Sequence, residues 1–240
     1  MDKINSIKKR ARVAGLLYLL LAITSIFGLM YVPSKIIVPQ DTLATVQNIM
    51  ASPTMFRLGI ISNLIYLVVF VFLVLAFYNL FKEVNQKFAL LMVALVLVAI
   101  PVAFINELNQ FAVLVLLGGD GYLKTLETEQ LHATVQLHLN LYEYGSNMVM
   151  LFWGLWLFPL GLLVLKSKFI PRVLGYMLII GCFGYVISSF TFLLSPHYGR
   201  IVFPIATLPS AIAEFSIILW LLIKGAKEQK PRFAGYNKGK

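Results

Sequence analysis

Charged residues are scarce in this chain of 240 residues. Asp, Glu, Lys and Arg make up 12% of it, against about 25% in a typical soluble domain, and hydrophobic residues make up 60%. The apolar residues form long blocks without the spaced stripes of a half-buried soluble helix. The composition therefore excludes a soluble globular enzyme and indicates an integral membrane protein whose surroundings are the lipid bilayer.

Other absences narrow the class further. The chain has one cysteine, Cys182, so it forms no internal disulfide. It has no Gly-rich phosphate loop, no nucleophile elbow and no cysteine pair, so it gives no motif for a cofactor. The apolar runs are continuous and lack the period-two alternation of a membrane β-barrel. An all-α, polytopic membrane helix bundle remains.

Six segments are long and apolar enough to cross the bilayer. A helix spans about 30 Å of hydrocarbon with about 20 residues, and the segments that meet this requirement are residues 13–31, 58–81, 88–118, 143–165, 173–194 and 201–223. We therefore predict six transmembrane helices, with a seventh possible if residues 119–142 add one. The predicted organisation is a basic N-terminus (1–12), a membrane domain (13–223) and a basic tail (224–240).

The basic residues predict the orientation. If both termini are cytoplasmic, sixteen of the twenty Lys and Arg residues lie in cytoplasmic segments, and only Lys35, Arg57, Lys124 and Arg200 lie outside. This bias follows the positive-inside rule, and an even number of spans agrees with it. The net charge of +10 is then explained by anionic headgroups, and we expect no nucleic-acid partner. The oligomeric state stays open.

Two longer connections are predicted on the outer side. Residues 32–57 carry a possible short helix that begins near Asp41, a good N-cap. Residues 119–142 start with a Gly-Asp-Gly turn and then have a helical pattern, which is compatible with a fourth membrane helix that begins outside the bilayer.

Three carboxylates lie in or beside the predicted spans: Glu107, Glu143 and Glu214. Such groups are rare in membranes and usually face the bundle interior or a watery cavity. The topology places them, with polar side chains of the neighbouring spans, on the outer side of the bundle. We therefore predict an outward-facing polar pocket that binds a small ligand or a cation, and its candidate residues are Glu107, Glu143, Glu214, Asn63, Asn106, Gln110, Asn140, Asn147 and Ser210.

Two of the carboxylates can also be explained without a polar pocket, and features of the third support one. Glu107 could pair with Arg57, and Glu143 could lie in interfacial water. Glu214 is the hardest to explain as filler, and Pro204 and Pro209 in its helix favour a distorted, cavity-lining segment.

Three functions remain open on these residues. The first is a transporter, sensor or resistance-type protein that uses the polar pocket. The second is an intramembrane metal-dependent hydrolase, for which His138 and Glu143 are weak metal candidates, because no ligand spacing matches a known motif. The third is a structural or accessory membrane protein whose polar groups only lock helix packing. No metal or other cofactor is predicted, and enzyme activity is left open.

Three stretches resemble one protein family. They are "RVAGLLYLLLA" near the start, "YEYGSNMVMLFWGLWLFPLGLLVLKSKFIPRVLGYMLIIGCFGY" in the middle and "AEFSIILWLLIKG" near the end. The chain resembles the bacterial multi-pass membrane family called domain of unknown function 4386. The resemblance implies a six- or seven-helix bacterial inner-membrane protein, and an acidic residue before the Tyr-Gly pair, which here is Glu143. It implies no activity.

Overall fold

The computed structural model describes residues 2–119 and 127–225, with side chains from Ile7 onward. The described residues form helices and connections, without strands. In chain order the elements are α1 (Asp2–Ser25), the π-helix η1 (Ile26–Tyr31), α2 (Val32–Ile36), α3 (Thr42–Ala51), α4 (Pro53–Phe81), α5 (Gln86–Leu117), α6 (Thr128–Leu155), α7 (Leu157–Ser167), α8 (Arg172–Leu194), α9 (Pro196–Ala206) and α10 (Leu208–Ile223).

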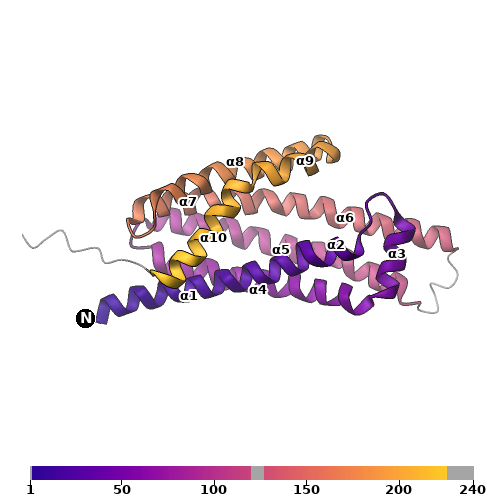
Figure 1. Ribbon diagram of the computed structural model, residues 1–240, viewed down its shortest axis with the longest axis horizontal. Helices are drawn as coiled ribbons and strands as arrows, with labels where there is room; N and C mark the ends of the chain where they lie inside the picture. The colour runs from indigo at the N-terminus through magenta and orange to yellow at the C-terminus, as the bar shows by residue number, and fades with distance from the viewer. Residues whose placement is uncertain (1, 120–126, 226–240) are drawn as a thin grey trace, which may run out of the picture.

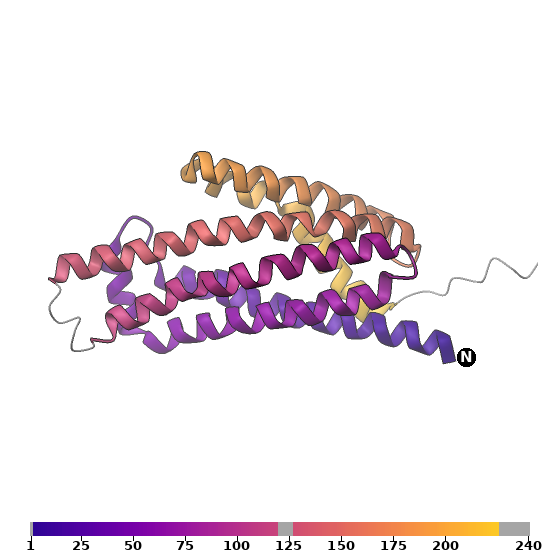
Figure 2. The same ribbon diagram turned by 180° about the vertical axis from the view of Figure 1, so that it is seen from behind.

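The long helices run roughly along one axis (Figure 1). One end of the bundle holds the start of α1 together with the α4–α5 and α7–α8 connections, and we call it the N-terminal end. The opposite end, which we call the distal end, holds α2, α3 and the start of α6 (Figure 2). The strongest packing joins α5 to α6, α1 to α4, α8 to α9 and α7 to α8.

Five helical runs in the described residues are long and apolar enough to cross a membrane: Ile7–Ile36, Pro53–Phe81, Gln86–Leu117, Thr128–Ser167 and Arg172–Leu194. Helices α9 and α10 are bent by 41° at Thr207, and they provide a sixth span if the bent pair counts as one. The predicted distortion in this segment is therefore found. Pro204 lies inside α9, and Pro209 lies in the first turn of α10, where its missing N–H costs no helical hydrogen bond.

Two of the predicted connections are also confirmed. The helix expected after Asp41 is α3, and the Asp41 carboxylate caps it by accepting a 2.8 Å hydrogen bond from the backbone N–H of Ala44. Helix α6 begins at Thr128, well before the predicted span 143–165, and α7 continues it to Ser167. The turn predicted at residues 119–121 and the basic tail at 224–240 lie largely outside the described residues.

Apolar side chains both fill the bundle and cover its outside. The main core includes Leu73 and Phe77 of α4, Met92 of α5 and Leu160 of α7, all fully buried. Large apolar side chains along the same spans stay exposed, such as Ile105, which is 67% exposed. An apolar exterior on such long helices is what contact with lipid requires, and the structure therefore supports a membrane-embedded bundle.

Candidate functional site

Glu107 lies in the middle of a polar cluster between α4, α5 and α6. Its side chain is only 4% exposed. The Tyr142 hydroxyl donates to Glu107 Oε1 over 3.1 Å, and Gln110 Nε2 donates to Glu107 Oε2 over 3.1 Å. Both donors are neutral, and no cationic side chain of the described residues pairs with the carboxylate.

Tyr142 of α6 links Glu107 of α5 to Asn63 of α4. Its single proton is given to Glu107, so its oxygen accepts from Asn63 Nδ2 over 3.1 Å. This fixes the orientation of the Asn63 amide, which is 1% exposed, and leaves Asn63 Oδ1 buried without a hydrogen-bond donor. The cluster thus has more acceptors than donors, because the carboxylate also keeps free lone pairs.

The π-helix η1 makes room for Asn63. A Cβ placed on Gly28, inside η1, would lie 2.1 Å from Asn63 Oδ1, so only glycine allows this approach. Single π-helical turns are rare and frequently lie at functional sites. Here the π-helix brings the backbone of the first span directly against the buried acceptor.

Asn106 completes the cluster on the side of α6. Its Nδ2 donates to the Tyr142 carbonyl over 3.0 Å and to Ser146 Oγ over 3.1 Å. A Cβ on Gly145 would come within 2.0 Å of Asn106 Oδ1, so glycine at 145 lets α5 and α6 approach closely. One connected set of polar residues results, which we call the Glu107 cluster: Asn63, Asn106, Glu107, Gln110, Tyr142 and Ser146. The sequence analysis did not identify the last two of these, Tyr142 and Ser146.

The other two glutamates have different partners. Glu143 forms a two-pronged ion pair with Arg200 of α9, with both N–O distances 2.8 Å, and both side chains are partly exposed. Glu214 of α10 is partly buried and accepts a 2.5 Å hydrogen bond from the hydroxyl of Tyr18 in α1. The three glutamates that the sequence analysis assigned to one pocket therefore have three separate sets of hydrogen-bond partners.

The remaining candidates do not join the Glu107 cluster through a hydrogen bond. Asn140 is exposed and accepts from Gln136 of its own helix over 2.7 Å. Asn147 donates to the backbone carbonyl of Glu143, and Ser210, fully buried, donates to the carbonyl of Thr207. Asn140, Glu143 and Asn147 follow one another at helical spacing of three and four residues, on a different face of α6 from Tyr142 and Ser146, which contact the cluster.

The alternative pairing of Glu107 with Arg57 is not found. Arg57 is exposed, and the ion pair among the described residues is the one between Glu143 and Arg200. The two weak metal candidates have different partners: His138 Nδ1 lies 3.1 Å from Asn109 Oδ1, and Glu143 forms an ion pair with Arg200. In the described part of the chain no three His, Cys, Asp or Glu side chains gather in a group suited to a metal.

The chain matches one known protein family. The family described as Domain of unknown function (DUF4386) matches residues 13–225, which is nearly the whole chain. The protein therefore belongs to this family, as the resemblance in its sequence predicted. No curated protein and no solved structure matches it.

Proposed function

We propose that this protein binds a cation at the Glu107 cluster, either a metal ion or the ammonium group of a small molecule. The observation that carries the proposal is a buried carboxylate with only neutral partners, beside the unpartnered acceptor Asn63 Oδ1. A charge in such a place costs several kcal/mol unless something compensates it. A bound cation supplies the missing charge and uses the free lone pairs.

The direction of access follows from the orientation that the basic residues predict. With both termini in the cytoplasm of a bacterial cell, the distal end of this multi-pass bundle faces outward across the inner membrane. Asn63 lies near the distal start of α4 and Glu107 near the distal end of α5, which supports access from the outer side. This placement fits a transporter, a sensor or a resistance-type protein, and does not require an enzyme.

The proposal is tested by cation-dependent unfolding of the purified protein in detergent. Sodium, potassium, magnesium, manganese and a series of alkylammonium salts are titrated at constant ionic strength, and binding is confirmed by calorimetry. We expect at least one cation to raise the unfolding temperature of the wild type and to have no such effect on Glu107→Gln. A bound ligand at 100 times its Kd stabilises by about 2.7 kcal/mol, which is readily measured.

Glu83→Gln is the matched control, because it removes the same charge from an exposed position in the α4–α5 connection. It should keep the full cation response. If every cation acts equally on the wild type and on Glu107→Gln, the cluster has no cation site. Its polar groups then serve helix packing, as expected for a structural or accessory membrane protein.

A further inference from the structure

A groove between α1 and α4 opens at the N-terminal end of the bundle, and none of its lining residues belongs to the Glu107 cluster. Its volume is about 550 Å³, in the range of small-molecule sites. Each wall is a single helical stripe: Arg10, Val13 and Leu17 on α1, and Phe72, Ala76 and Asn79 on α4. The small side chain of Ala76 leaves the space in the middle of the groove.

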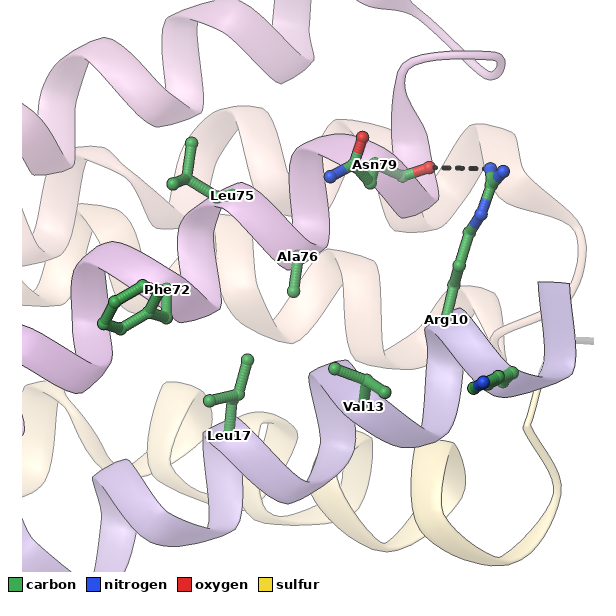
Figure 3. A pocket seen from close by; sticks show the side chains of 8 residues that line it. Arg10, Val13, Leu17, Phe72, Leu75, Ala76 and Asn79 are labelled. Atoms are coloured by element: carbon green, nitrogen blue, oxygen red, sulfur yellow. Dashed lines mark hydrogen bonds between the residues drawn. The ribbon is translucent and has the colours of Figure 1, made fainter. Parts of the chain in front are cut away.

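The two ends of the groove differ in chemistry. Arg10 and Asn79 lie at one end, and Leu17 and Phe72 lie at the other (Figure 3). Val13 is 45% exposed and Phe72 is 57% exposed, so the apolar part offers uncovered hydrocarbon.

The polar end is cationic. Lys9 and Arg10 line it, and Arg10 reaches across to α4, where its Nη1 donates to the backbone carbonyl of Asn79 over 3.4 Å. Lys82 lies beside them, because its Nζ donates to Asn79 Oδ1 over 3.3 Å. No carboxylate of the described residues forms an ion pair with these three cations. The ion pair among the described residues joins Glu143 to Arg200, on α6 and α9.

The groove is about two thirds as long as one leaflet of the hydrocarbon core is thick. From Arg10 to Leu17 a helix rises about 10 Å, which takes the groove from the headgroup level towards the middle of a hydrocarbon core about 30 Å thick. Basic pockets between membrane helices with apolar surface below them suit anionic lipid headgroups. The exposed apolar walls suit an acyl chain.

We propose that this groove is a binding site for one anionic glycerophospholipid. Its phosphate lies between Lys9, Arg10 and Lys82, and one acyl chain lies along Val13, Ala76 and Phe72. The site is independent of the Glu107 cluster and uses none of its residues.

The proposal is tested by native mass spectrometry of the detergent-solubilised protein. Apparent Kd values are measured for phosphatidylglycerol and for phosphatidylcholine with identical acyl chains. We expect phosphatidylglycerol to bind at least 10-fold more tightly. The double variant Lys9→Gln/Arg10→Gln should weaken phosphatidylglycerol binding by about 30-fold and leave phosphatidylcholine unchanged.

Two further variants separate the groove from general surface charge. Lys87→Gln/Arg172→Gln removes the same charge from exposed positions at the same end of the bundle and should keep tight binding. Ala76→Phe fills the groove without changing charge and should abolish tight binding. Circular dichroism checks that each variant keeps its helices. Equal affinity for the two lipids, an equal loss in the charge control, or unchanged binding in Ala76→Phe overturns the proposal.

Discussion

The hydroxyl of Tyr142 lies 3.1 Å from Oε1 of Glu107 and holds this buried carboxylate against α6. The same oxygen accepts from Asn63 Nδ2, so one phenol connects three helices. A buried polar network of this kind is sensitive to the loss of any member, because each remaining group keeps its desolvation cost.

Tyr142→Phe is therefore expected to destabilise the protein by about 1–3 kcal/mol, since it leaves both Glu107 Oε1 and Asn63 Nδ2 without that partner. The free energy of unfolding in mixed micelles measures the change. Tyr176→Phe, at a 59% exposed tyrosine, is the control and should shift it by less than about 0.5 kcal/mol. Equal effects of the two substitutions would show that the Tyr142 hydroxyl is dispensable.

The hydrogen bond from Tyr18 to Glu214 joins the first span to the last. A double-mutant cycle with Tyr18→Phe and Glu214→Leu isolates it, because each substitution removes one partner, and we expect a coupling energy of about 0.6–1.7 kcal/mol, the range of polar interactions between membrane helices. The measurement is again unfolding in mixed micelles. Strict additivity of the two substitutions would contradict a bond that contributes to stability.

Gly184 allows α8 to approach the break between α9 and α10. A Cβ at this position would lie 1.9 Å from the backbone oxygen of Ala206, and a backbone atom cannot move aside as a side chain does. Gly184→Ala should therefore cost about 1–3 kcal/mol of stability, measured by thermal unfolding. Gly15→Ala is the milder comparison, because its nearest neighbours are side-chain carbons at 3.1 Å. A larger cost at Gly15 would refute this description of the α8–α9 contact.

Cysteine labelling tests the orientation. In a Cys182→Ala background, Lys87→Cys reports on the N-terminal end of the bundle and Glu129→Cys on the distal end, and both positions are exposed. We expect a membrane-impermeant maleimide to label the cysteine at 129 in intact cells. The cysteine at 87 should react only after permeabilisation, because the positive-inside rule predicts that the basic connections stay in the cytoplasm. The reverse pattern would invert the proposed topology and place the Glu107 cluster on the cytoplasmic side.

The sequence predicted most of the spans because apolarity along a helix is a local property. The predicted segment 58–81 ends with α4 at Phe81, and 173–194 corresponds to α8 within one residue. The early start of α6 was also predicted, from the helical pattern that follows the Gly-Asp-Gly turn. The π-helix at Ile26–Tyr31 was not predicted, because a change of helix type leaves no signal in the hydropathy pattern.

For the candidate site, the sequence identified Glu107, a carboxylate whose burial in a membrane span costs free energy, and several of its neighbours. Glu107, Gln110, Asn106 and Asn63 are polar groups in apolar runs, and all four belong to the cluster. Tyr142 went unnoticed because a tyrosine at the end of a span is ordinary and gives no sign of its partner.

The amino-acid sequence by itself determined that the chain is a helical membrane protein of the DUF4386 family with carboxylates in its spans, because composition, run length and family motifs need no knowledge of packing. The tertiary structure alone decided which groups meet. The rotation of α6 about its axis turns Tyr142 and Ser146 towards α5, and Glu143, one residue from Tyr142, towards Arg200 instead. Successive helical residues point about 100° apart, so only the packing of neighbouring helices selects the face that reaches Glu107.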